Sequence, residues 1–354
     1  MMDSALHALR HPFELLFDPT QRLSLFYMGT ALVAAIFVYW RSREYTREHG
    51  LKGLLEWLIP IEVLTHDSAK ADYVMFFVNK SLIAAIYASI LIQAPFWLGV
   101  VEQVMGPAPA GADQTSWFIT AIYTAVMILA FDAALWFAHY IFHRVPFLWE
   151  FHKVHHSAEV MTPLTAARMH PVEEAVAATF SGFVVGTTFG LLDQIFGTGS
   201  RVFSLFDVNI FLFAFFLAAF NLRHSHVWLQ YPNWLQHIFV SPAQHQIHHS
   251  KARRHWDKNM GFIFAFWDWS AGTLHSPKNN ENVEFGLGNG EDGTWNNALV
   301  LYFRPFKNAY DLWRQKGRGA FVPNEDESEA SPEATATRAA HRSSPQTVRG
   351  VMSE

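Results

Sequence analysis

Five stretches of this 354-residue chain are apolar and nearly free of charge over the length needed to cross a bilayer. A hydrocarbon core of roughly 30 Å requires about 20 apolar residues in a helix. The stretches cover residues 23–40, 81–101, 117–139, 176–192 and 202–220. Because backbone groups in lipid must be hydrogen-bonded within the segment, each is expected to be helical. The sequence therefore predicts an all-α, polytopic membrane bundle of four or five spans, in which the last two form a tight hairpin.

Basic residues give this bundle an orientation. Four of them follow the first stretch between positions 41 and 52, whereas the loop 102–116 has no Lys or Arg. By the positive-inside rule, the N-terminus lies outside and the 41–80 loop is cytoplasmic. Counting crossings then places residues 140–175 and everything after 221 in the cytoplasm. Both histidine-rich parts of the chain are thus expected on the same side of the membrane.

Composition excludes several classes of function. The net charge is -5 and no long Lys/Arg run occurs, which argues against a nucleic-acid partner. With no cysteine, the chain can form no disulfide, zinc ribbon or Cys-ligated cluster. A zinc hydrolase is disfavoured because neither HExxH nor HxxEH occurs. Any metal must therefore bind nitrogen and oxygen ligands, and 19 histidines are available.

The histidines fall into spaced groups that suit metal binding. Residues three or four apart on a helix share a face, so each group can direct two or three imidazoles to one point. One such group alone would most often be hydrogen-bonded core histidines, but two copies of HxxHH beside apolar stretches favour metal. The number of imidazoles exceeds what one ion needs and indicates two ions. The candidate ligands are His139, His143, His152, His155, His156, His224, His226, His245, His248 and His249.

The ordered set of motifs resembles the histidine boxes of the fatty acid hydroxylase/sterol desaturase superfamily. The boxes read HYIFH, HKVHH, HSH and HQIHH in this chain. Three further stretches are similar to the family's signatures: RMHPVE at 168–173, DKNMG at 257–261 and WDWSAGT at 267–273. The resemblance covers about residues 120–275. The third box departs from the usual pattern, so which of His224 and His226 binds metal stays open.

The resemblance implies a membrane-bound, nonheme di-iron centre that uses O₂ to hydroxylate or desaturate a lipid. Such chemistry needs an external electron donor as a partner, and the lipid bilayer supplies the substrate. Three other residues are candidates for the catalytic site. Asp132, seven residues before His139, is expected to orient a ligand imidazole or to bridge two helices. His170 and Asp257 lie in the family-like stretches, where His170 could bind metal and Asp257 could orient a ligand or cap a helix.

The expected organisation has four parts. Residues 1–116 form N-terminal membrane and interfacial helices, residues 117–275 the catalytic domain, residues 276–322 a C-terminal extension and residues 323–354 a disordered tail. Within the first part, the segment 51–64 is either an interfacial helix or a loop helix packed on the bundle.

Other functions remain open at this point. Within the same family, a lipid or sterol desaturase or an ether-lipid monooxygenase would share the ligand set with a hydroxylase. From other classes, a membrane metal transporter or metal-binding protein would place histidines through the spans, and a bis-histidine haem protein would use single mid-span histidines. For location, a bacterial inner membrane is favoured, with the endoplasmic reticulum second.

Overall fold

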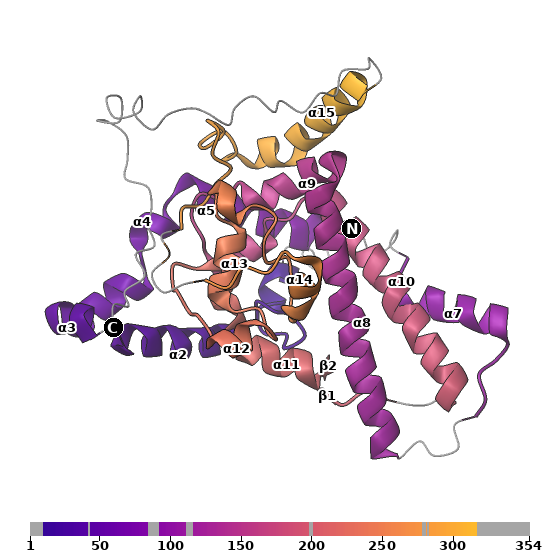
Figure 1. Cartoon of the computed structure of the whole chain (residues 1–354). Helices are drawn as coiled ribbons and strands as arrows, with labels where there is room; N and C mark the ends of the chain where they lie inside the picture. The colour runs from indigo at the N-terminus through magenta and orange to yellow at the C-terminus, as the bar shows by residue number, and fades with distance from the viewer. Residues whose placement is uncertain are drawn as a thin grey trace.

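The computed structural model describes residues 10–41, 43–83, 92–110, 116–197, 201–277, 281 and 283–316 (Figure 1). The expected all-α class is confirmed for this part, because its two strands have only two residues each. The longer helices are α2 (Leu25–Arg41), α3 (Arg43–Leu58), α5 (Asp67–Val78), α7 (Ala94–Met105), α8 (Trp117–Arg144), α9 (Pro146–His156), α10 (Pro171–Phe196) and α15 (Ala298–Lys316). The shorter ones are α4 (Ile61–Leu64), η1 (Asn79–Ile83), η2 (Pro163–Ala167), α11 (Ile210–Leu217), η3 (Phe220–His224), α12 (Asn233–Gln236), α13 (Pro242–His248), η4 (Arg253–His255) and α14 (Phe266–Ala271).

Helices α8 and α10 are long and apolar enough to cross a membrane. Only 33% and 22% of the residues in their most apolar windows are buried, so both present apolar surface outward. They run down together from the histidine-bearing part of the molecule, with α7 beside α10 (Figure 1). The close approach of α7 requires a glycine at position 186, because any side chain there would overlap the Ala94 carbonyl. These features suggest a membrane protein.

The expected span at 202–220 is wrong. Ser204–Leu205 and Val208–Asn209 form a hairpin, β1–β2, whose two turn residues, Phe206 and Asp207, have positive φ. Positive φ at both turn residues is the geometry of a type I′ hairpin and cannot continue a helix. Asn209 then caps α11, which has only eight residues.

The predicted pairing of the last two spans is also not found. The helix packed most closely on α10 is α7, followed by α8, and not α11. Of the expected span at 81–101, residues 84–91 lie outside the described part, and α7 begins at Ala94. The 51–64 segment forms the end of α3 and the short α4. The proposed disordered tail, 323–354, lies outside the described residues.

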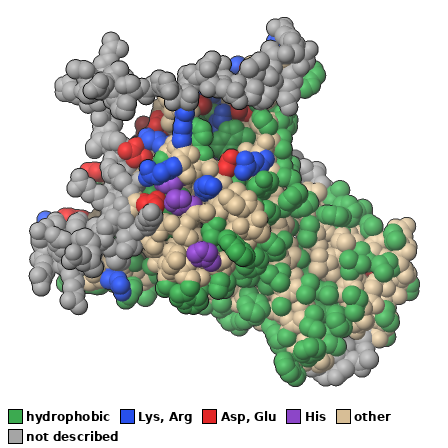
Figure 2. All heavy atoms as spheres, in the orientation of Figure 1, with side chains coloured by type: hydrophobic (Ala, Val, Ile, Leu, Met, Phe, Trp, Pro, Cys, Tyr) green, Lys and Arg blue, Asp and Glu red, His purple; other side chains and the backbone are tan. Residues whose placement is uncertain are grey.

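A buried arginine holds the histidine-bearing part together. Arg168 is fully buried and pairs with Asp72 of α5 at 2.8 Å. Its guanidinium also donates to the carbonyls of Val154 (3.0 Å), on α9, and Trp295 (2.9 Å), just before α15. Because the guanidinium donates in several directions, it fixes α5, α9 and the segment before α15 relative to one another. Most visible charged side chains gather in this part, whereas hydrophobic side chains dominate the far ends of α8 and α10 (Figure 2).

Candidate metal centre

Nine of the ten candidate histidines meet in two adjacent clusters. Within each cluster, one nitrogen from every ring lies within 4.8 Å of all the others. Cluster A consists of His139, His143, His152, His156 and His248. Cluster B consists of His155, His224, His245 and His249. Helices α8, α9 and α13 and the turn η3 supply them, so segments far apart in sequence build one site.

The two HxxHH boxes exchange their middle histidines. In the box on α9, His152 and His156 face cluster A, whereas His155 faces cluster B. In the second box, which starts on α13, the pattern is reversed, because His248 faces cluster A while its two companions face cluster B. Residues four apart share a helix face, and a residue next to one of them points about 100° away. Each box thus contributes to both clusters, and the rings of His155 and His249 lie 4.5 Å apart.

In cluster A, the Nε2 atoms converge on one another. The Nε2 atom of His152 lies 3.0 Å from that of His139, 3.1 Å from that of His143 and 3.1 Å from that of His156. Neighbouring ligands around one ion with metal–nitrogen bonds of about 2.1 Å lie about 3.0–3.4 Å apart. The observed spacing is therefore that of imidazoles sharing an ion.

Fixed acceptors hold the other nitrogens of cluster A. The Nδ1–H groups of His139 and His248 donate to the carbonyls of Met260 and Lys258, each at 2.8 Å. His152 donates to Glu173 at 2.7 Å, and His143 donates to Asp257 at 3.3 Å. These bonds place the proton on Nδ1 and leave the Nε2 lone pairs free. Several lone pairs facing one point repel one another unless a cation lies between them.

Cluster B has the same convergence without the same support. Its Nε2···Nε2 separations are 3.0 Å for His224–His245, 3.2 Å for His224–His249 and 3.2 Å for His245–His249. The Nδ1 atoms of His155, His245 and His249 are buried and have no hydrogen-bond partner within the described part of the chain. The ring orientations in cluster B therefore depend on packing.

Burial keeps these imidazoles neutral. Loss of solvent, reinforced by the neighbouring His139 and by arginines, lowers the pKa of His155 to about 3. The same loss of solvent, followed by repulsion from adjacent imidazoles, holds the pKa of six others well below the usual value: His152, His156, His224, His245, His248 and His249. Neutral imidazole is the form that binds metal, so no proton has to leave at neutral pH.

These observations test whether the residues fit metal ions. The Nε2 atom of His248 is buried without a partner in the described structure, while its Nδ1 is already used. All nine donors are imidazole nitrogens, which suit Fe, Zn, Cu and Ni. The nine residues therefore fit two adjacent transition-metal ions, with five candidate ligands for one and four for the other.

One predicted ligand, His226, and one further candidate, His170, lie elsewhere. The ring of His226 packs edge-on against Trp57 at 5.1 Å, outside both clusters, so of the HSH pair only His224 joins the site. The Nδ1 atom of His170 accepts from the Val172 amide as the cap of α10, and its Nε2 donates to the Tyr302 carbonyl at 3.0 Å. His170 therefore has a structural place at the start of α10.

Of the two roles expected for Asp132, the structure agrees with the bridge between helices, and no contact with an imidazole is found among the described residues. Its carboxylate accepts from the amides of Ile263 (2.7 Å) and Phe264 (3.0 Å) and from Trp267 Nε1 (3.0 Å). These hydrogen bonds connect the segment before α14, at Ile263 and Phe264, to α8. Asp257, in contrast, contacts His143 as expected and also pairs with Arg144 at 3.2 Å.

Sequence reasoning missed Glu173 as a partner of the site. It stands in the first turn of α10, and its carboxylate accepts from His152 Nδ1. The only sequence signal was its place in the RMHPVE stretch. The backbone carbonyls of Lys258 and Met260 gave no side-chain signal, although DKNMG contains both residues.

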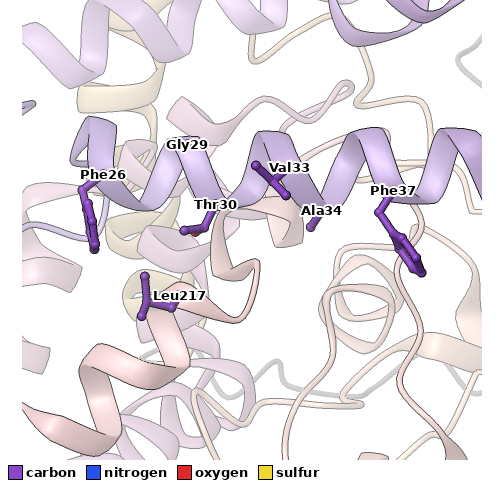
Figure 3. A pocket seen from close by; sticks show the side chains of 7 residues that line it. All are labelled: Phe26, Gly29, Thr30, Val33, Ala34, Phe37 and Leu217. Atoms are coloured by element: carbon purple, nitrogen blue, oxygen red, sulfur yellow. The ribbon is translucent and has the colours of Figure 1, made fainter.

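An open groove lies apart from this site. It has a volume of about 560 Å³ and is lined by α2 residues and by Leu217 of α11 (Figure 3). None of its lining residues is a histidine or a carboxylate. The opposite side of α2, at Ala31 and Ala35, packs on Leu222 of η3. The groove therefore lies on the outer side of α2 and does not reach the clusters.

Fold and site together define a class of helical proteins that gather many buried imidazoles at one end of apolar helices. The fatty acid hydroxylase model matches residues 124–273, which include all nine clustered histidines. This match and the curated relatives support a place for residues 124–273 in the fatty acid hydroxylase/sterol desaturase superfamily. No solved structure matches the chain significantly.

Curated relatives include three kinds of lipid enzyme. An alkylglycerol monooxygenase of Caenorhabditis elegans is 25% identical over 51% of this chain and 32% of its own length. The ornithine lipid hydroxylase OlsE of Rhizobium tropici is 25% identical over 44% of the chain and 43% of its own length. The Delta(7)-sterol 5(6)-desaturase ERG3B of Gibberella zeae is 23% identical over 53% and 52%. The chain thus matches between about a third and a half of each relative's length.

Proposed function

We propose that this chain is a membrane-bound, di-iron oxidoreductase that uses O₂ and electrons from a separate donor to hydroxylate a lipid. The convergence of nine buried imidazoles in two adjacent clusters carries this proposal. The relatives support a lipid as substrate, since their names include an alkylglycerol, an ornithine lipid and a sterol. Lipid desaturation and ether-lipid oxygenation remain alternatives, because two of the relatives carry those activities in their names.

The chain's own residues prepare the site for this chemistry. Clusters A and B would each hold one iron, and bound iron supplies the redox chemistry that activates O₂. Glu173 and Asp257 accept the Nδ1 protons of His152 and His143 and so hold these rings with Nε2 toward the site. Trp149 packs against His143 and His156 at 5.2 and 5.4 Å and helps to exclude water.

A metal transporter is less well supported by the arrangement. Both clusters lie in one compact group at an end of α8, and they include only His139 and His143 from that helix. A route for ions across a bilayer would need donors along the length of α8 or α10. For their described lengths, the site histidines occur only in the last two turns of α8.

The test combines metal analysis with lipid analysis. Protein purified in detergent after growth with iron is expected to contain about two irons per chain, and a His155→Ala/His248→Ala variant is expected to lose most of both. Membranes from cells expressing the intact chain should then contain a lipid that has gained one oxygen atom. Loss of two hydrogen atoms from the lipid would identify a desaturase instead. A chain that folds correctly and binds no metal would contradict the proposal.

A further inference from the structure

A third group of metal-ligating side chains lies outside clusters A and B. His255 ends η4, His275 follows α14, and Glu281 lies further along the chain. One nitrogen of each histidine and one carboxylate oxygen all lie within 4.8 Å of one another. His255 Nε2 is 3.2 Å from Glu281 Oε2, and His275 Nε2 is 3.3 Å from Glu281 Oε1. The Glu281 carboxylate thus lies between the two imidazoles.

The Nε2 atom of His255 lies close to another hydrogen-bond acceptor. Arg254 Nε donates to His255 Nε2 at 3.0 Å, so this nitrogen acts as an acceptor. The same nitrogen faces a carboxylate oxygen, which also has only lone pairs to offer. His255 is fully buried, and its Nδ1 has no hydrogen-bond partner among the described residues. A second positive charge between His255 and Glu281 would remove the repulsion between the two acceptors.

We propose that His255, His275 and Glu281 bind one divalent transition-metal ion at a site separate from both clusters. Two imidazoles and a carboxylate are a ligand set that Zn²⁺ and Fe²⁺ accept. The side chains of His275 and Glu281 are 28% and 14% exposed, so water can complete the coordination and the ion can exchange with solvent. Arg254, which is exposed, would turn away from His255 on binding.

This ion would stiffen the loop that supports cluster A. The His275 amide donates to Asn259 Oδ1 at 2.7 Å, and the Asn259 side chain donates to the Gln244 carbonyl at 3.0 Å. Asp257 and Lys258, immediately before Asn259, accept the Nδ1 protons of cluster A histidines. An ion bound by His255 and His275 would therefore connect the two ends of the segment 255–275, which contains these acceptors.

The charge of Arg254 makes the site testable in both directions. Its guanidinium opposes a cation a few ångströms away, so an Arg254→Gln variant should bind the ion about tenfold more tightly. His275→Ala and Glu281→Gln should abolish binding, and Glu281→Gln keeps the side-chain volume in case His275→Ala does not fold. His237→Ala is the matched control, because His237 is exposed and lies outside all three groups.

The experiment titrates the full chain in detergent with Co²⁺, after the protein has been saturated with iron, and follows visible absorption and bound metal. The expected result is one equivalent beyond the iron, present in His237→Ala and absent in His275→Ala and Glu281→Gln with the iron content unchanged. No additional equivalent in the intact chain, its retention in both variants, or weaker binding by Arg254→Gln would overturn the proposal. The comparison between variants is valid whatever metal the clusters hold, so it is independent of the proposed oxygenase activity.

Discussion

Clusters A and B have similar nitrogen spacings but different support. Four of the five histidines in cluster A have Nδ1 bound to a carboxylate or a backbone carbonyl. Three of the four in cluster B have a buried Nδ1 without a partner in the described structure. Partners of this kind fix the tautomer and ring orientation and raise the basicity of the ligand. We therefore expect cluster A to hold its ion more tightly and cluster B to adjust more easily.

Removal of the two exchanged histidines should give the largest effects and separate the clusters. His155→Ala removes a ring from cluster B although it lies in the first box, and His248→Ala removes one from cluster A although it lies in the second. Each should cost at least about a hundredfold in affinity for one ion. Metal analysis and calorimetry measure the loss. If both variants affected the same ion, the exchanged arrangement would be incorrect.

Acid should destabilise the folded chain and thereby release metal from both clusters. The pKa values of the folded-state histidines are lowered, with that of His155 at about 3. The unfolded chain therefore binds more protons below the usual histidine pKa of about 6.5. The contribution of these histidines to stability is thus complete above about pH 6.5 and is lost as the pH falls.

Iron content and thermal unfolding, measured between about pH 7.5 and 5, test this pH dependence. At neutral pH, where the fold stays intact, a chelator should remove the ion of cluster B faster than that of cluster A, because fewer cluster B rings have an Nδ1 partner in the described structure. Loss of both ions at a single rate would show that the difference in Nδ1 support has no consequence for retention.

Glu173→Gln should weaken cluster A alone, by about tenfold to a hundredfold in metal affinity, because an amide replaces the carboxyl group that accepts the His152 Nδ1–H bond. The neighbouring Glu174 offers a matched control, since it pairs with Lys80 and contacts no histidine of the site in the described contacts. Glu174→Gln should leave both ions in place. Equal effects of the two substitutions would mean that charge near the start of α10, and not the bond to His152, matters.

His226→Ala should have the smallest effect. The ring lies against Trp57 and outside both clusters, so metal content and turnover should stay within about twofold of the intact chain, with a modest loss of stability from packing. The matched comparison is His224→Ala, which removes a member of cluster B. A loss of metal in His226→Ala comparable to that in His224→Ala would place His226 at the site.

The sequence predicted the parts of this molecule that depend on local pattern. Uncharged length predicted α8 and α10, and histidine spacing predicted which rings could converge. Spacing on a helix defines a face but not what packs against that face. The exchange of His155 and His248 between the clusters could therefore not be predicted from the sequence. The same limit applies to Asp132, whose partners are backbone amides more than 130 residues later.

The failure at 202–220 has a different cause. Apolar content there is high enough for a span, but Phe206 and Asp207 adopt positive φ and Asn209 caps a new helix. Turn chemistry at two or three positions outweighed the apolar character of the rest. Asp207 and Asn209 were the signals visible in the sequence. Hydropathy averaged over about 20 residues does not register the positions of such turn residues.

The exchange of histidines between the boxes also has a consequence for the order of biosynthesis. Four members of cluster A lie between His139 and His156 and leave the ribosome close together, whereas three of the four members of cluster B follow at His224 or later. Since chains fold from the N-terminus as they are made, the first half-site can gather before its partner exists. His248 then completes cluster A, and the later histidines of cluster B assemble around His155, which has already been made. Neither half-site is complete until the second box has been translated.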